Sequence, residues 1–160
     1  MPELTLANPV FATYAICAML GVLKIVAQGW DTAYRLSKHK AGYASPEDLH
    51  QGRLNPHPDP ATQLAPHEAV ERSRRMHRND LENIPAFLAA GLLFVLVDPP
   101  LWLAQLTMYG FVLARVAHGF AYATAQSHEV RATCYTVGSL MTAYMAVHVI
   151  VAAIRSGTLI

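Results

Sequence analysis

Two long stretches of the chain contain no charged residue. Residues 4–23 and 132–154 lack Asp, Glu, Lys and Arg over 20 and 23 residues, respectively. About 20 consecutive apolar residues cross the hydrocarbon core of a bilayer as an α-helix, so each stretch is long enough to span a membrane. Backbone polar groups in lipid must be paired within the segment itself, and helices are therefore the expected structure of both stretches.

A third apolar region lies between these two and is divided by a turn. Residues 83–126 carry only two charges, Asp98 and Arg115. Two prolines follow Asp98, and proline is tolerated at the start of a helix but disfavoured in its interior. The pattern predicts an all-α fold, an integral membrane four-helix bundle that forms one domain over residues 1–160. The expected helices cover about residues 8–34, 67–97, 99–126 and 129–155, with a polar loop at about 35–66.

The composition supports a membrane protein and argues against two other classes. Hydrophobic residues make up 53% of the 160 residues and charged residues only 14%, with a net charge of +1. This balance argues against intrinsic disorder and against a nucleic-acid-binding surface. Seventeen of the 23 charges fall within residues 24–82, so the rest of the chain cannot give every helix the polar face that a water-soluble bundle needs.

Lysine and arginine are concentrated in the polar loop and at the start of the second helix, whereas the turn at Asp98 has none. The positive-inside rule then places this loop, and the turn between the third and fourth helices, in the cytoplasm. We expect a multi-pass protein of a bacterial inner membrane or an endoplasmic reticulum. No metal site is expected, because the loop residues His50, His57 and His67 lack compact ligand spacing.

Charged residues recur at one depth of the predicted bundle. Glu82 precedes Asp98 by 16 residues and Arg115 follows Pro99 by 16 residues, so each lies about 24 Å from the turn. Both therefore fall just inside the cytoplasmic boundary of a core about 30 Å thick. Helical spacing arranges the polar residues near this depth in three stripes, comprising Arg75, Asn79 and Glu82; Arg115, His118 and Tyr122; and Arg131, Tyr135 and Gly138.

Two interpretations of these stripes remain open. Charges at this depth are costly unless they are paired, so the stripes are consistent with ion pairs that hold helices together, with Asp80 and Arg115 as the expected structural pair. Four arginines in the stripes and their neighbours nevertheless outnumber the acids Asp80 and Glu82. A surplus of guanidinium groups favours a site for an anionic ligand, because guanidinium binds carboxylates bidentately.

The stripes lie within three motifs that resemble one family. The sequence ERSRRMHRNDLENI at residues 71–84 is similar to the second-helix signature of the MAPEG family, the membrane-associated glutathione-dependent enzymes. The sequence RVAH at residues 115–118, followed by Tyr122, resembles the family's third-helix motif. Arg131 with Tyr135 resembles the start of its fourth helix, and the resemblance extends over nearly the whole chain.

The resemblance implies a homotrimer of four-helix subunits, with glutathione bound between neighbouring subunits. Arg35 would reach the site from the adjacent subunit, and Arg131 and Tyr135 would act as catalytic residues on the thiol. The residues that match glutathione-binding positions of the family are Arg35, Arg78, Asn79, Glu82, His118, Tyr122, Arg131 and Tyr135.

The chemistry of glutathione agrees with these residue types. Arginines suit its two carboxylates, and Glu82 suits its ammonium group. The nucleophile is the thiolate, and a free thiol has a pKa of about 8.5. Lowering that pKa to about 7 requires the site to stabilise the thiolate over the thiol by roughly 2 kcal/mol. A guanidinium such as that of Arg131 can supply this stabilisation electrostatically in a partly desolvated site.

The motifs divide between two branches of the family. HRND and RVAH most resemble prostaglandin E synthase, whereas DLENI equally resembles the microsomal glutathione transferase. The synthase has a serine after the arginine that corresponds to Arg131, and this chain has Ala132 there. We therefore expect a membrane glutathione transferase that attacks a lipophilic electrophile, with glutathione peroxidase activity in addition. A prostaglandin-E-synthase-like isomerase is the alternative, and a non-catalytic membrane scaffold is the alternative of another class.

Overall fold

The computed structural model of the chain describes residues 3–157. Within them the structure is helical and contains no strand, as the sequence predicts. A polar connection after α1 contains a short 3₁₀ helix, η1 (Pro46–Leu49), and a four-residue helix, α2 (Pro60–Gln63). The long helices in the described part are α1 (Pro9–His39), α3 (Glu68–Leu96), α4 (Leu101–Ala123) and α5 (His128–Arg155).

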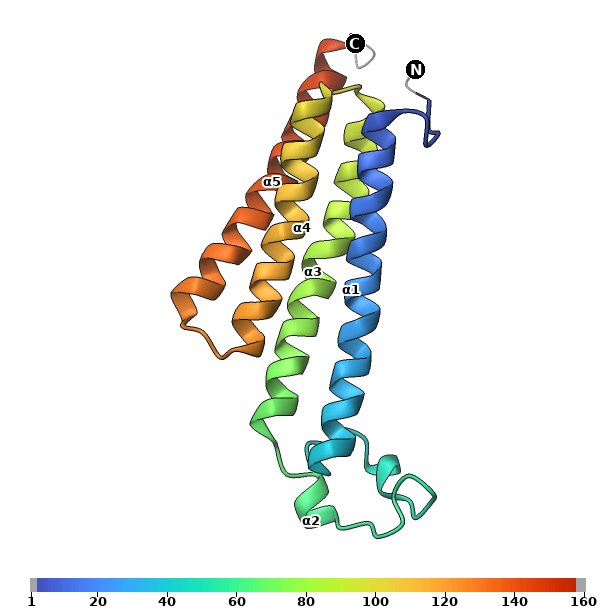
Figure 1. Cartoon of the computed structure of the whole chain (residues 1–160), viewed down its shortest axis with the longest axis vertical. Helices are drawn as coiled ribbons and strands as arrows, with labels where there is room; N and C mark the ends of the chain where they lie inside the picture. Colours follow the sequence, from blue (N-terminus) through green and yellow to red (C-terminus); the bar gives the residue numbers. More distant parts are fainter. Residues whose placement is uncertain (1–2, 158–160) are drawn as a thin grey trace.

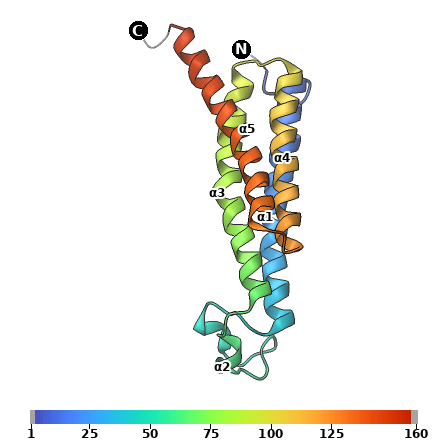
Figure 2. The same ribbon diagram turned by 90° about the vertical axis from the view of Figure 1, so that its left-hand side faces the viewer.

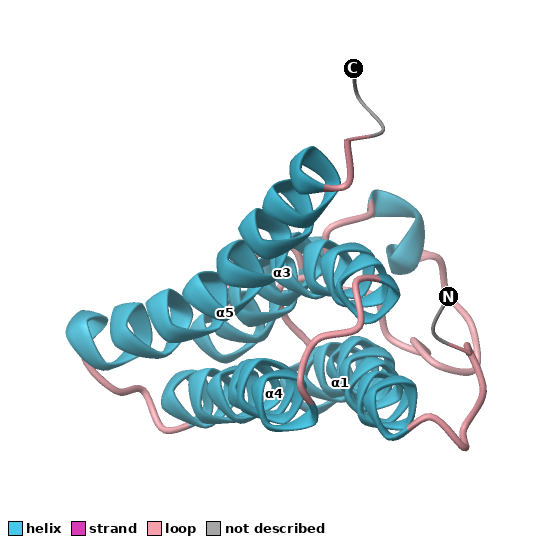
Figure 3. Ribbon diagram, turned by 90° about the horizontal axis from the view of Figure 1, so that it is seen from above, coloured by secondary structure: helices cyan, strands magenta, loops and turns pink. Residues whose placement is uncertain are grey.

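The long helices run side by side along an elongated molecule (Figures 1 and 2). The start of α1 and the end of α5 lie at one end of the bundle, and the loop with α2 lies at the other. Seen along the bundle, α1 and α4 form one layer, and α3 and α5 form the other, with α5 crossing obliquely (Figure 3). Each layer packs on the other through contacts of α1 with α3 and of α4 with α5.

Helix α1 continues to His39 and does not end near residue 34, where the sequence pattern placed its boundary. The polar residues after 34 contain no helix breaker, so the helix continues beyond the apolar stretch. It ends at Lys40, whose left-handed φ of 47° stops the helix while its N–H donates to the carbonyl of Leu36 at 2.9 Å. As a consequence Arg35 belongs to a helix and not to the loop.

The turn at Asp98 joins α3 to α4 at the end of the bundle where α1 begins and α5 ends. Asp98 adopts a left-handed conformation with a φ of 50°, and its N–H donates to the carbonyl of Val95 at 3.1 Å. Pro100 precedes the first residue of α4 and accepts a hydrogen bond from the N–H of Leu103 at 2.9 Å. The two helices are thereby held antiparallel, which brings their opposite ends together near the candidate site.

Aromatic side chains fill the centre of the bundle. The rings of Phe87 and Phe111 are stacked between α3 and α4, with centroids 4.0 Å apart. Phe94 meets the ring of His148 on α5 edge to face at 5.1 Å. All three phenylalanines are 0–1% exposed, and burial of a large apolar side chain contributes about 1.5–3 kcal/mol. This packing fixes how α3, α4 and α5 are rotated about their axes.

Three helices of the described residues are long and apolar enough to cross a membrane: α1, α3 and α5. This finding supports an integral membrane protein, while a crossing by α4 stays a prediction. Only 11% of the most apolar window of α5 is buried against its own chain. The rest of that helix presents apolar side chains outward, and these suit lipid or another protein subunit.

Candidate functional site

A buried polar cluster centres on Asp80 of α3, whose side chain is fully buried. Lys24 of α1 donates to its Oδ2 atom and forms an ion pair with it. Gln28, one turn further along α1, donates from Nε2 to the same oxygen at 2.7 Å. From α4, Nη1 of Arg115 lies 3.5 Å from Asp80 Oδ1 and donates to Oδ1 of Asn79 at 2.8 Å. One carboxylate therefore joins three helices at a single depth.

The guanidinium of Arg115 is 1% exposed and only partly satisfied by this cluster. Its Nε and Nη2 atoms are buried and have no hydrogen-bond partner among the described residues. They face Gly138 of α5, where an added Cβ would come within 3.3 Å of Nε. The glycine thus permits α5 to approach Arg115 closely, and the two unused donors face that helix.

A second cluster forms where α4 ends and α5 begins, around the ring of Tyr122. The guanidinium carbon of Arg131 lies 4.8 Å from the centroid of this ring, within the range of a cation–π interaction. His118, one turn earlier on α4, meets the same ring edge to face at 4.9 Å and is 2% exposed. Helical spacing predicted that His118 and Tyr122 share a face, and the turn between the helices adds Arg131 to them.

Arg131 and Tyr122 line a polar cavity of about 200 Å³ between α3 and the α4–α5 turn. Glu68 is the one carboxylate in its wall, and it accepts from Nη2 of Arg75 at 2.7 Å and from Nη2 of Arg72 at 3.4 Å. Three guanidinium groups against one carboxylate leave the cavity cationic. Its walls are formed by Glu68, Arg72, Arg75, Tyr122, Ala125, Gln126 and Arg131.

Tyr135 of α5 lies beside the Asp80–Arg115 cluster and does not line the polar cavity. It lies one turn beyond Arg131, and the guanidinium carbon of Arg115 is 5.7 Å from its ring centroid. The residue is 40% exposed, so part of it is open to a ligand. Asn79, in contrast, is occupied within the chain, because its side-chain oxygen accepts from Arg115 and its backbone carbonyl accepts from Asn83 at 2.7 Å.

Arg78 and Glu82 of α3 are exposed and lie outside the cavity. Neither side chain makes a hydrogen bond or an ion pair within residues 3–157. They follow Arg75 by three and seven residues, so they extend its face of the helix away from the loop. The structure therefore places these two predicted ligands beside the cavity, on a surface that a single chain leaves open.

Arg35 is held by its own chain. Its Nε donates to Oδ2 of Asp31 at 2.7 Å, one turn earlier on α1. The same aspartate oxygen accepts from the hydroxyl of Ser73 on α3 at 2.9 Å. Arg35 and Tyr122 line a common crevice between α1, α3 and α4, so this arginine lies close to the site within one subunit.

Sequence reasoning did not assign a role to four residues that the structure places in these clusters. Lys24 and Gln28 bind Asp80, and Arg72 and Gln126 line the polar cavity. Lys24 is the first charge after a 20-residue uncharged stretch, and an ionisable residue within a membrane span indicates a buried partner. Arg72 precedes Arg75 by three residues, a spacing that puts both on one face.

The fold and these clusters define a class, an all-helical integral membrane protein with a cationic cavity at the end of the bundle near its polar loop. The chain belongs to the MAPEG family, whose model matches residues 14–151. It is 37% identical over 149 residues to microsomal glutathione S-transferase 1 of Sus scrofa, covering 91% of this chain and 94% of that protein.

Relatives of a second kind match equally widely. The chain is 34% identical over 143 residues to prostaglandin E synthase of Equus caballus, covering 89% of this chain and 88% of that protein. It is 30% identical over 155 residues to prostaglandin E synthase of Homo sapiens, covering 96% of each. The family and these relatives together indicate a glutathione-dependent membrane enzyme.

Proposed function

We propose that the chain is a membrane glutathione transferase that activates the glutathione thiol for attack on lipophilic electrophiles. The observation that carries this proposal is the cationic cavity in which Arg131 lies over Tyr122 and two further arginines face a single glutamate. Such a cavity suits a small polar anion with two carboxylates. Because the surrounding helices are apolar, an electrophile dissolved in the bilayer would have access to the depth of this cavity.

Glutathione binding is divided between the cavity and the open surface of α3. Arg72 and Arg75 in the cavity would bind a carboxylate of glutathione, which leaves Arg131 for the thiolate. Arg78 offers a further unpaired guanidinium, and Glu82, one turn on, offers a carboxylate for the ammonium group. His118 is too buried to be a principal ligand, and its contribution is to hold the ring of Tyr122.

Two residues on α5 act on the thiol. Arg131 stabilises the thiolate by its charge, and Tyr135 donates a hydrogen bond to it from its hydroxyl. Attack of the thiolate on a carbon electrophile forms the C–S bond, and the leaving group departs with the bonding electron pair. No protein base is required, because the electrostatic preference for the thiolate releases the thiol proton to water near neutral pH.

Assembly as a homotrimer would cover surfaces that a single chain leaves open. Arg78 and Glu82 lie on an uncovered face, and most of α5 is unburied within the chain. Packing of a neighbouring subunit against these surfaces would enclose the glutathione site and bring a second Arg35 near it. Native mass spectrometry should give trimers, and monomers that retain turnover of glutathione would contradict this assembly.

The site faces the cytoplasm in this proposal, where glutathione is available. The residues that line the polar cavity belong to the start of α3 and to the α4–α5 turn, toward the end of the bundle that carries the loop with α2. Residues 35–78, which comprise this loop and the helix ends beside it, hold eight of the 12 lysines and arginines. The positive-inside rule places that end in the cytoplasm. Protease accessibility of the loop in sealed, oriented membrane vesicles measures the orientation directly.

The decisive experiment combines binding and turnover with the purified protein in detergent. Isothermal calorimetry should detect glutathione, with weaker binding in Arg78→Ala and unchanged binding in Arg53→Ala, a loop control outside the site. Turnover is then measured with a chloronitrobenzene, a lipid hydroperoxide and a prostaglandin endoperoxide. Absence of glutathione binding overturns the site, and equal binding by the two variants removes Arg78 from it.

A glutathione-dependent prostaglandin E isomerase is the second candidate, favoured by the widely matching synthase relatives. This isomerase would use the same glutathione thiolate as the transferase. The two reactions differ in the electrophile, which for the isomerase is an endoperoxide oxygen. Ala132 is the residue that favours conjugation over this reaction, because it supplies no hydroxyl next to Arg131. Peroxidase activity would use the same glutathione thiolate and would appear as turnover of the lipid hydroperoxide. A non-catalytic scaffold, in contrast, would bind glutathione and show no turnover in any of the three assays.

A further inference from the structure

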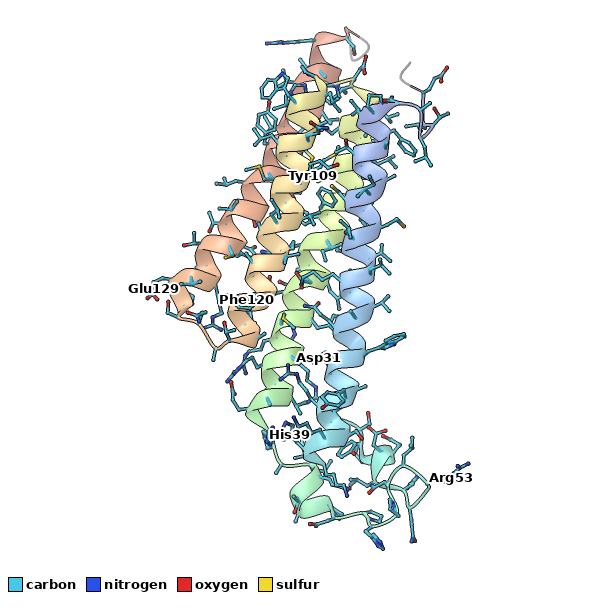
Figure 4. The ribbon with its side chains drawn as sticks, viewed as in Figure 1. Asp31, His39, Arg53, Tyr109, Phe120 and Glu129 are labelled. Carbon is cyan, nitrogen blue, oxygen red and sulfur yellow. The ribbon has the colours of Figure 1, made fainter. Side chains whose placement is uncertain are left out.

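A groove of about 660 Å³ lies between α1 and α4, on the outer face of the layer that these helices form. Its volume falls within the range of about 300–1,000 Å³ that is typical of small-molecule sites. Its walls are mostly apolar, and Leu20, Val116 and Phe120 among them are exposed. Figure 4 labels Phe120 on α4 and Asp31 on α1, which mark the end of the groove nearer the polar loop. Exposed apolar walls of this kind suit a hydrocarbon chain.

The polar cluster beneath this groove carries one positive charge in excess. Lys24 and Arg115 both line the groove, and both form ion pairs with the single carboxylate of Asp80. Asp31, the acid at the end of the groove, is paired with Arg35, so these two residues add no net charge. Charges at membrane depth are costly unless they are paired. Within the described residues the cluster therefore lacks one anion.

The side chain of Lys24 brings this excess charge to the groove, beside Gly119 of α4. A Cβ added at Gly119 would lie 3.3 Å from Lys24 Nζ, so the absence of a side chain there leaves space next to the ammonium group. The side chain of Lys24 is 17% exposed, whereas that of Arg115 is 2% exposed. The ammonium group carries three N–H donors, and Asp80 is its one acceptor among the described residues. Lys24 is therefore the cation of the cluster that a ligand in the groove can bind.

A carboxylate is the group that complements Lys24. It carries the missing negative charge, and its oxygens accept hydrogen bonds without donating any. A hydroxyl group supplies no charge, and an amine adds a further positive charge. Asp31 does not oppose a carboxylate at Lys24, because it lies seven residues, or about 10 Å, further along α1. Its Oδ2 atom also accepts hydrogen bonds from Arg35 and Ser73.

The depth of Lys24 selects a single-chain lipid. Lys24 lies 15 residues after Pro9, the first residue of α1, or about 22 Å along the helix. In a hydrocarbon core about 30 Å thick that begins at Pro9, Lys24 lies about 8 Å inside the boundary on the side of the polar loop. The phosphate groups of bilayer lipids lie outside this core, whereas a carboxylate on one hydrocarbon chain reaches Lys24 without drawing a second chain into the groove. The tail then lies along Leu20 and Val112, toward the bilayer centre.

We propose that the groove between α1 and α4 binds a long-chain fatty acid, with its carboxylate on Lys24 and its tail along the apolar walls. This site is separate from the proposed glutathione cavity, because it lies on the α1 side of α4, whereas the cavity lies between α3 and the α4–α5 turn. The fatty acid neutralises the excess charge of the cluster, holds α1 against α4 and is not consumed.

The test uses oleate as the probe and the full chain in detergent, with bound lipid counted by native mass spectrometry. Oleyl alcohol is the matched ligand control, because it has the same tail and still accepts a hydrogen bond but carries no charge. We expect the alcohol to bind about tenfold more weakly, because hydrogen bonds between two charged partners are the stronger ones. Equal binding of oleate and oleyl alcohol overturns recognition of a carboxylate.

A pair of glycine variants tests the role of Lys24 while leaving its ion pair with Asp80 in place. Gly119→Ala puts a methyl group against the ammonium group and should weaken oleate binding about tenfold, with little effect on oleyl alcohol. Gly110→Ala is the matched control on the same helix, because its added Cβ meets Met141 of α5 at 3.5 Å and not the groove. Equal binding of oleate by the two variants overturns the assignment to Lys24.

A second pair of variants locates the tail. Ala27→Phe fills the groove and should abolish most oleate binding, whereas Val26→Phe, at the adjacent exposed position outside the groove, should leave it unchanged. A diazirine analogue of oleate should label Val116 and Phe120 preferentially. Labelling spread over all the apolar helices overturns the site. Chain-to-chain cross-links from a cysteine placed at Ala123 also overturn it, because a second copy would then cover the groove.

Discussion

The guanidinium of Arg131 lies over the ring of Tyr122, with 4.8 Å between the guanidinium carbon and the ring centroid. The two residues belong to different helices, and the short turn from α4 to α5 brings them together. The aromatic face stabilises the cation without neutralising it, so the positive charge remains available to an anionic ligand. This arrangement motivates the predictions about the thiol.

Replacement of Arg131 by alanine should remove the preference for the thiolate. Loss of roughly 2 kcal/mol corresponds to about a thirtyfold lower thiolate fraction below the thiol pKa, and it raises the pH at which conjugation reaches half its maximum. Thiolate absorbance and the pH profile of conjugation measure the effect. Arg131→Lys should retain part of the activity, because charge survives and the guanidinium geometry does not. A wild-type pH profile in Arg131→Ala would place thiol activation elsewhere, with Tyr135 as the next residue to test.

Tyr122 should act on catalysis through its ring. Tyr122→Leu removes the cation–π contact, worth about 0.5–2 kcal/mol, and should lower kcat/KM for conjugation by about three- to thirtyfold. Tyr122→Phe keeps the ring face and should recover most of the loss. If phenylalanine and leucine reduce the rate equally, the hydroxyl group of Tyr122 and not its ring is what matters.

Asp80 should be essential for stability. Asp80→Asn leaves the buried cations Lys24 and Arg115 without their counter-charge, and removal of one partner from a buried ion pair costs about 3–5 kcal/mol. Thermal unfolding in detergent should show a large fall in Tm. Glu47→Gln in the exposed loop is the matched control and should leave Tm nearly unchanged. Equal Tm values for the two variants would mean that the cluster contributes little to the fold.

Ala132 tests the choice between conjugation and isomerisation. Ala132→Ser introduces a hydroxyl group directly after Arg131, where the resemblance to prostaglandin E synthase predicts one. If the missing hydroxyl group is what prevents isomerase activity in the unmodified chain, Ala132→Ser should raise turnover of a prostaglandin endoperoxide. It should raise turnover of a chloronitrobenzene by a smaller factor. A uniform change in both rates would show that this position does not select the electrophile.

The sequence by itself determined the helical fold, the turn at Asp98 and the common level of the polar residues along the bundle. Uncharged stretches fix which segments are helical, and the rise per residue fixes how far a residue lies from a turn. These quantities were sufficient to bring Arg115 to the level of Asp80, and the structure places their side chains 3.5 Å apart. The helical segments, the position of the turn and the level of a residue each depend on one helix at a time. They can be predicted without knowing how the helices pack together.

The tertiary structure decided which faces meet. Periodicity gives the face of a helix but not its rotation relative to a neighbour, which depends on the shapes of side chains such as Phe87 and Phe111. The sequence therefore did not show that Lys24 and Gln28 reach Asp80. It also did not show that Arg131 lies over Tyr122, because that contact depends on the direction in which α5 leaves the turn after α4.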